Sequence, residues 1–201
     1  MAVTRERFEQ GMSYDAYKAG MGQNKEQFEN NERNLDLHAE DLAAFKNLPQ
    51  PLNVLVIAED WCGDVVGNLP ILGRLARDSG KLNLNVFYRD QPQNRDLMAQ
   101  YMNGEFESIP VFAFFDDDFN QVGLWIERPK GVSGLREQKR REIYRDNPEF
   151  GSPDGAIDEL PEETRGRLRA AIRDMRAATV PFSNQEVIRE LREVVERVLV
   201  R

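Results

Sequence analysis

The only cysteine of the chain, Cys62, stands where an apolar segment gives way to a helical pattern. Residues 52–58 (LNVLVIA) are short and rich in β-branched side chains, which predicts a buried strand. An acidic turn follows, and then the tetrapeptide Trp61-Cys62-Gly63-Asp64 opens a helix with apolar residues at helical spacing. A thiol at a helix start lies beside unpaired backbone N–H groups and the positive end of the helix dipole. Because both favour the nucleophilic thiolate, this tetrapeptide is the first candidate for chemistry.

The stretch from Pro51 to Arg128 resembles the thioredoxin superfamily. Trp61-Cys62-Gly63-Asp64-Val65 stands where that family has W-C-G-P-C, and Pro70 matches a proline inside the following helix. Ser108–Phe115 (SIPVFAFF) is similar to the family's strand that opens with a cis-proline facing the cysteine. The resemblance implies an α/β fold, a thioredoxin-like mixed sheet flanked by helices. It also implies that Cys62 is the nucleophile and that the substrate is bound by Trp61, Gly63, Asp64, Ile109 and Pro110.

Three positions depart from the family. Val65 replaces the second, resolving cysteine, Val56 replaces the buried acid, and Val86 stands where a lysine is common. Intramolecular dithiol chemistry is therefore excluded, and only monothiol routes remain. Cys62 could attack a mixed disulfide and be reset by a small thiol such as glutathione or bacillithiol, or form a sulfenic acid with peroxide that an external thiol resolves. We expect protein or low-molecular-weight thiols and disulfides as partners, and no cofactor.

Other roles for Cys62 stay open. Thioredoxin-like folds also serve as redox-inert binding modules, and a free cysteine is among the most buried residue types. The acids at Asp60 and Asp64 oppose a thiolate, so Cys62 should be less acidic than in relatives with proline at position 64. A metal site built from Cys62 with Glu59, Asp60 or Asp64 is not expected, because one thiol without histidine is a poor ligand set for soft metals. His38 is the only histidine, and no feature places it near Cys62.

Composition excludes several classes of protein. The 201 residues carry a formal net charge of −8, without the basic patch expected of a nucleic-acid-binding protein. No run of 18 apolar residues is present, so we expect no membrane span. The first residues lack the apolar segment of a secretory signal, and one cysteine cannot form an internal disulfide. The expected location is cytoplasmic.

The pattern of elements predicts three segments: a helical extension over 1–50, the thioredoxin-like core over 51–128, and a second helical extension over 129–201 that packs on the core. In the first segment Thr4 and Ser13 are candidate N-caps, and Asn30-Asn31 is expected to interrupt a helix. In the core, Gly80 should end the helix that contains Pro70, and residues 111–115 and 121–126 should form an antiparallel hairpin.

In the last segment, residues 130–134 are expected to be a loop before a charged helix over 135–146. Pro181 should end a further helix, and Ser183 with Glu186 resembles a capping box that starts the last one. That last helix carries an apolar stripe from Val187 to Leu199 at helical spacing. The stripe should lie on the core or against a partner subunit, so a homodimer is possible.

Overall fold

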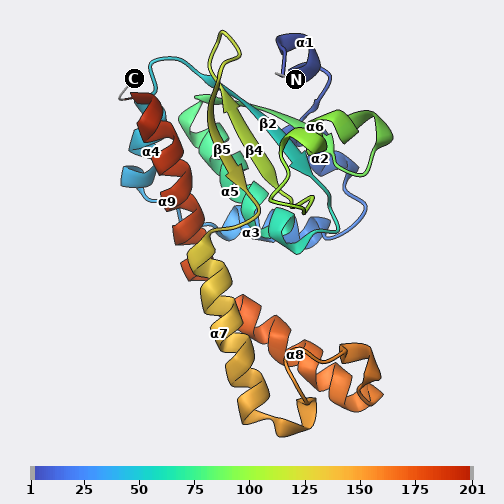
Figure 1. Cartoon of the computed structure of the whole chain (residues 1–201). Coiled ribbons are helices and arrows are strands. Elements are labelled where there is room, and N and C mark those ends of the chain that lie inside the picture. The colour runs from blue at the N-terminus through green and yellow to red at the C-terminus, as the bar shows by residue number, and fades with distance from the viewer. Residues whose placement is uncertain (1–2, 200–201) are drawn as a thin grey trace. The chain divides into compact units, whose positions relative to one another are not determined.

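The apolar run at residues 52–58 forms the middle strand of a five-stranded mixed sheet in the computed structural model, which describes residues 3–199 (Figure 1). The strand order is β1-β3-β2-β4-β5. Their bounds are β1 Met12–Ser13, β2 Leu52–Ala58, β3 Leu82–Tyr88, β4 Val111–Phe115 and β5 Gln121–Ile126. The sheet and its flanking helices confirm the predicted α/β, thioredoxin-like fold class.

Strand β2 runs parallel to β3 and antiparallel to β4, and β4 and β5 form the predicted hairpin. All seven residues of β2 are buried, because the strand has neighbours on both edges and side chains packed on both faces. A strand buried in this way reads as a continuous apolar run, which is why its sequence does not alternate. The register pairs Val56 with both Val86 and Phe112.

Helices precede, connect and follow the strands. They are α1 Arg5–Phe8, α2 Tyr14–Gly20, α3 Lys25–Asn34, α4 Ala39–Lys46, α5 Gly63–Ser79, α6 Arg95–Gln100, α7 Lys130–Asp146, α8 Glu162–Ala178 and α9 Val180–Leu199. Short 3-10 turns lie at Pro92–Asn94, Pro148–Phe150 and Ile157–Glu159. Thr4 and Ser13 cap α1 and α2 as predicted, each accepting a backbone N–H at 3.2 Å. The interruption predicted at Asn30-Asn31 is wrong, since α3 continues through both residues.

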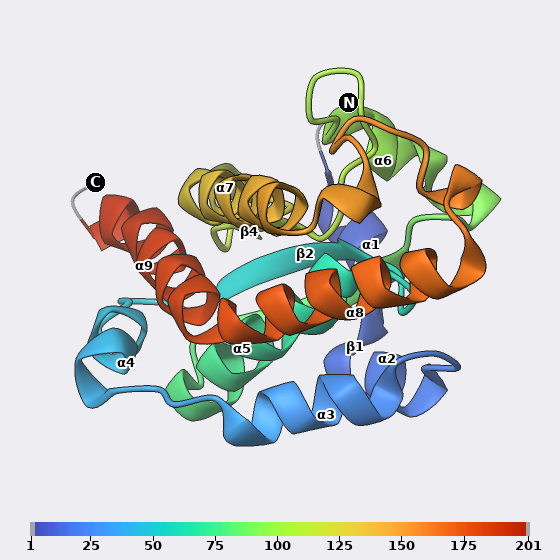
Figure 2. The same cartoon turned by 90° about the horizontal axis from the view of Figure 1, so that it is seen from below.

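Helix α5 follows β2 directly and carries Pro70 in its interior, and Gly80 ends it with a left-handed φ of 65°, as predicted. Helix α3 runs alongside α5 (Figure 2). The amino-terminal segment packs tightly on α5 at Gly73, where a Cβ atom would lie 2.3 Å from Cζ of Tyr14. The absence of a side chain at Gly73 therefore allows the Tyr14 ring to lie against the helix.

Contacts divide the chain into two units, one containing residues up to 128 together with those from Val187 onward, and the other containing Pro129–Glu186. The division into three segments stays a prediction. Within the second unit, the loop predicted at 130–134 is wrong, because α7 already begins at Lys130. Pro181 is the second residue of α9 rather than a helix end, so Ser183 lies inside the helix and its N–H bonds to the Thr179 carbonyl at 2.9 Å. A proline in a first helical turn costs no hydrogen bond, since that turn has no intrahelical acceptor for its N–H.

The apolar stripe of α9 joins the core of the first unit. Val187, Leu191 and Val195 are fully buried in the same cluster as the sheet. On β5, Gly123 makes room for Val194, and the indole N–H of Trp125 donates to Glu190 at 2.8 Å. Of the two predicted positions, the core and a partner subunit, the stripe therefore lies on the core. The homodimer stays a prediction.

Candidate functional site

Cys62 occupies the N-cap position of α5, immediately after the turn that follows β2. Its backbone N–H donates to the Glu59 carbonyl at 3.2 Å, and its own carbonyl accepts from Val66 at 3.0 Å, the first bond of the helix. The change from strand to helix thus fixes the thiol where the sequence predicts it, at the unpaired N–H groups of a helix start.

The two motifs of the sequence meet at this thiol. Cys62 is half-buried, and its Sγ donates to the backbone carbonyl of Ile109 at 3.6 Å. The Ile109–Pro110 peptide bond is cis, and both residues are buried. Gly63 is exposed, and a Cβ atom there would meet no atom within 4 Å, so the surface beside the thiol is open.

Trp61 precedes Cys62 in the chain and is 43% exposed. Its indole N–H donates to Asp90 Oδ2 at 3.2 Å, and the guanidinium of Arg89 lies 4.8 Å from the centre of the ring. Arg89 also pairs with Asp90 at 2.7 Å. These contacts fix the orientation of a large exposed apolar side chain next to the reactive group.

Asp64 forms an ion pair that the sequence analysis missed. Its Oδ2 lies 3.0 Å from Nη2 of Arg128, which also pairs with Glu127. Glu127 adopts a left-handed φ of 65°, unusual for a residue other than glycine. Its N–H donates to the Pro110 carbonyl at 2.7 Å, and its carbonyl accepts from the buried Asn68 at 2.9 Å. This backbone positions Arg128, and no local pattern in the sequence marks it.

The turn before Cys62 is tied to the amino-terminal helices. Asp60 Oδ2 accepts the N–H groups of Gly22 and Gln23 at 2.7 and 2.9 Å. Glu59 is buried and accepts the N–H of Asp90 at 2.7 Å. Burial raises the pKa of the Glu59 carboxyl, although the hydrogen bond from Asp90 acts in the opposite direction. The amino-terminal segment is therefore part of the support of the site.

Opposing influences act on the pKa of the Cys62 thiol, and the net result is a raised value. Burial raises it most, whereas the backbone N–H groups of Val65 and Asp64 lower it by favouring the thiolate. The Asp64 carboxylate raises the pKa further, and the charge of Arg128 lowers it. The thiol therefore needs a higher pH to ionise than an unperturbed cysteine.

The family's remaining redox positions hold apolar side chains. Val65 and Val56 are both fully buried, so neither a second thiol nor an acid lies at those places. His38 is exposed at the N-cap of α4, 3.8 Å from Asp36, and within residues 3–199 no hydrogen bond joins it to Cys62. Across residues 3–199, no group of three or more His, Cys, Asp or Glu side chains is arranged to hold a metal ion. Within the same range, no helix is long and apolar enough to cross a membrane.

A sequence model described as thioredoxin matches residues 11–140. The chain belongs to the thioredoxin family. The matched range takes in α2, α3 and α4, which precede the stretch from Pro51 to Arg128 that carries the resemblance in sequence. No curated protein matches the chain.

Among solved structures, an HIV epitope scaffold is 18% identical, with 97% of this chain and 98% of that chain covered and a TM-score of 0.65. A protein of unknown function from Pseudomonas aeruginosa is 22% identical, with 87% and 99% covered and a TM-score of 0.61. Thioredoxin f2 from Chlamydomonas reinhardtii is 18% identical, with 53% and 89% covered and a TM-score of 0.32. The first two extend the likeness of fold to the helices around the core.

Proposed function

We propose that this thioredoxin-family protein carries out thiol–disulfide exchange by a monothiol mechanism through Cys62. The observation that carries the proposal is the half-buried Sγ at the start of α5, 3.6 Å from the carbonyl that precedes the cis-proline. The substrates are protein or low-molecular-weight disulfides, and the site needs no cofactor. We place the protein in the cytoplasm, where a lone thiol stays reduced.

The reaction begins when the Cys62 thiol loses its proton. The thiolate attacks one sulfur of a disulfide, a new S–S bond forms with Cys62, and the other sulfur leaves as a thiolate. Deprotonation also removes the hydrogen bond from Sγ to the Ile109 carbonyl. That carbonyl can then accept an N–H from an extended substrate segment beside Pro110. The N–H groups of Asp64 and Val65 favour the negative sulfur.

Val65 determines how the cycle ends. Since no second thiol lies in the chain, the mixed disulfide on Cys62 cannot be resolved internally. An external thiolate attacks the substrate sulfur of the mixed disulfide. A new disulfide forms between the external thiol and the substrate, and Cys62 is released as the thiolate. The adduct should therefore persist until a small thiol is supplied.

Intact-mass spectrometry of the native chain with bis(2-hydroxyethyl) disulfide tests this proposal. We expect one hydroxyethylthio adduct, none in Cys62→Ser, and complete loss of the adduct when 2-mercaptoethanol is added. An adduct that forms only after unfolding in urea would refute the proposal.

A redox-inert binding module is the second candidate. The raised thiol pKa and the valines at positions 56 and 65 favour it, because each removes a part of the dithiol machinery. In that case the surface around Cys62 and Pro110 binds a partner segment without covalent chemistry. The same mass experiment separates the two candidates, since an inert module gives no adduct in the native state.

A further inference from the structure

A short turn before the cis-proline carries the most exposed of the large apolar side chains that the structure describes. Phe106 is 72% exposed, and it lies three residues before Ile109, whose carbonyl accepts the Cys62 thiol. In this turn the N–H of Asn103 donates to the Phe106 carbonyl at 2.8 Å, and the reverse bond measures 3.1 Å. Gly104 supplies the left-handed residue that the turn needs, with a φ of 64°. The exposed ring is therefore attached to a hydrogen-bonded backbone.

The face on which Phe106 projects leads towards the thiol site. Asn103 and Phe106 form an antiparallel bridge, and residues directly opposite each other in such a pair place their side chains on one face. The Asn103 amide donates to Glu127 Oε2 at 3.3 Å, and Glu127 pairs with Arg128. Arg128 pairs in turn with Asp64, in the first turn of α5. A chain of side-chain contacts therefore joins the face that carries Phe106 to the helix start beside the thiol.

A second set of contacts joins the same turn to Trp61. Arg89 Nη1 donates to the Glu107 carbonyl at 3.2 Å, and the Arg89 guanidinium lies 4.8 Å from the centre of the Trp61 ring. The exposed rings of Trp61 and Phe106 thus belong to the two segments that the thiol hydrogen bond joins. Exposed apolar area of this kind marks a surface for a macromolecular partner, because burying it releases water.

Acidic side chains outnumber basic ones around these rings. We count the charged groups of residues 59–64 and 102–107 together with those bonded to them, and leave out Glu59, because burial raises the pKa of its carboxyl. Six carboxylates then face two guanidinium groups, which leaves a surplus of four negative charges. The groups are Asp60, Asp64, Asp90, Glu105, Glu107 and Glu127 against Arg89 and Arg128.

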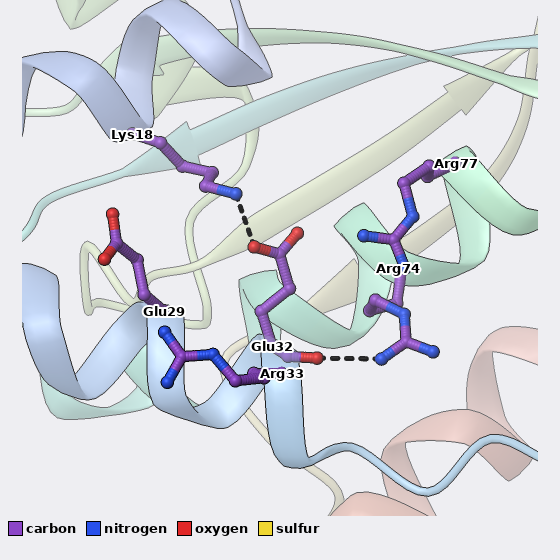
Figure 3. Close-up of a pocket in the computed structure, with 6 residues that line it drawn as sticks. All are labelled: Lys18, Glu29, Glu32, Arg33, Arg74 and Arg77. Carbon is purple, nitrogen blue, oxygen red and sulfur yellow. Dashed lines mark hydrogen bonds and ion pairs between the residues drawn. The ribbon is translucent and has the colours of Figure 1, made fainter.

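The two acids of the turn are not neutralised. Glu105 and Glu107 are exposed, and neither side chain has a hydrogen bond or an ion pair within residues 3–199. The cavity between α2, α3 and α5 differs, since four cations and two carboxylates line it, and Figure 3 shows Lys18 reaching Glu32 there. Residues 129–186 carry 11 Lys and Arg against 11 Asp and Glu, so the net charge of −8 belongs to the unit that contains the thiol. The acids of the turn are therefore available to a cationic partner.

We propose that Cys62 acts on a basic polypeptide whose disulfide is flanked by lysine or arginine and by an apolar side chain. The apolar side chain packs on Phe106, and the cations lie beside Glu105 and Glu107. Charge complementarity selects this partner, because a surface with a surplus of carboxylates attracts cations and repels an anionic disulfide. The inference rests on the proposed thiol–disulfide exchange and names the substrate class of that reaction.

Three capped pentapeptides with a central cysteine, each blocked as a mixed disulfide with thiopyridine, test the inference on the full chain. Their flanking residues are lysine with leucine, lysine with serine, or glutamate with leucine. The Cys62 thiolate attacks the peptide sulfur, the peptide becomes disulfide-bonded to Cys62, and the thiopyridone that leaves is followed by absorbance. Each rate is divided by the rate of the same peptide with N-acetylcysteine amide, which removes differences in intrinsic reactivity.

The peptide with lysine and leucine should react fastest. Its rate should exceed that of the glutamate peptide about tenfold at an ionic strength of about 20 mM, and this ratio should fall towards one at about 1 M, where the Debye length is about 3 Å. Its rate should exceed that of the serine peptide about threefold, because leucine buries apolar surface on the exposed ring. Salt should not reduce the second ratio.

Two pairs of variants assign these ratios to residues. Phe106→Ser should abolish the preference for leucine and keep that for lysine, whereas Phe106→Leu, its matched control, should keep both. Glu105→Gln combined with Glu107→Gln should lower the preference for lysine about threefold and leave that for leucine unchanged. Asp117→Asn combined with Asp118→Asn removes two exposed acids from the end of the β4–β5 hairpin remote from the cis-proline, and this matched control should change neither ratio. Thermal melting confirms that each variant is folded.

The outcomes separate this inference from the proposed function. A normalised ratio of one for either pair, lysine against glutamate or leucine against serine, would overturn the inference and leave the exchange reaction standing. Ratios that persist unchanged in Phe106→Ser and in the double glutamine variant would overturn it as well, since another surface would then select the peptide. If the native chain releases no thiopyridone from any peptide, the exchange reaction itself is refuted, and the inference with it.

Discussion

Asp64→Asn should make Cys62 a stronger nucleophile at neutral pH. Asp64 lies two residues after the thiol, and its carboxylate pairs with Arg128 at 3.0 Å. The substitution removes a negative charge that opposes the thiolate. It also leaves Glu127 as the carboxylate that pairs with Arg128, so the positive charge of Arg128 is neutralised less. Both effects lower the pKa of the thiol.

The size of the effect follows from the burial of the pair. The Asp64 side chain is 17% exposed, which places it between bulk water and a dry interior. For charges about 6 Å apart and an effective dielectric constant of about 40, Coulomb's law gives about 1.4 kcal/mol, or about one pKa unit. The thiolate fraction below the pKa then rises about tenfold. Since nucleophilicity falls with pKa by a Brønsted slope of about 0.4–0.5, the rate at pH 7 should rise about three- to fourfold.

The assay is the pH dependence of the reaction with a neutral dithiodipyridine, followed by absorbance. Above both pKa values the variant should be slower by about threefold, because its thiolate is the weaker nucleophile, so the two profiles should cross. Arg128→Gln should shift the pKa upward instead. Asp117→Asn, which removes an exposed carboxylate paired with Arg5, is the matched control and should shift it little.

The reasoning is refuted if the Asp64→Asn profile coincides with that of the native chain. It is equally refuted if the Asp64→Asn and Arg128→Gln profiles shift in the same direction. The first result would mean that the Asp64 charge does not act on the sulfur, and the second that the pair acts on it by a route other than charge.

Two further predictions concern stability. Gly73→Ala should lower the free energy of unfolding by about 1–3 kcal/mol in urea titrations, because the new Cβ would lie 2.3 Å from the Tyr14 ring. Gly67→Ala in the same helix should raise it by up to about 1 kcal/mol, since nothing lies within 4 Å of its Cβ, and a loss of equal size in both variants would contradict the packing argument. The pKa of Glu59 is raised in the folded state. Its contribution to the free energy of unfolding is therefore greatest below the pKa of the unfolded chain, and it falls as the pH rises through the pKa of the folded chain. Glu59→Gln should therefore gain stability relative to the native chain between pH 4 and pH 8 in thermal melts, and a constant difference would contradict this.

Much of the core could be predicted from the sequence because its signals are local. The β-branched run at 52–58 needs two buried faces, and Gly80 supplies the left-handed residue that ends α5. Cys62 lies at the N-cap of α5 because the strand ends and the helix begins on either side of it. Such features depend on neighbours in the chain, and the sequence shows those neighbours directly.

The features that were missed depend on distant residues or on an ambiguous one. The pairing of Asp64 with Arg128 joins residues far apart in sequence through the left-handed backbone at Glu127, which no short pattern encodes. Pro181 in the sequence fits the end of one helix and the first turn of the next equally well, and in the structure it lies in the first turn of α9. The loop expected over residues 130–134 is helical, because α7 begins at Lys130 and continues through both of its glycines.

Alkylation of Cys62 in the native chain by iodoacetamide, compared with the rate of global unfolding, tests the central claim most directly. If the fold presents a reactive thiol, labelling should depend on iodoacetamide concentration and proceed much faster than unfolding, with a rate that rises with pH through a single ionisation. Labelling no faster than the chain unfolds, whatever the concentration of reagent, would contradict the claim.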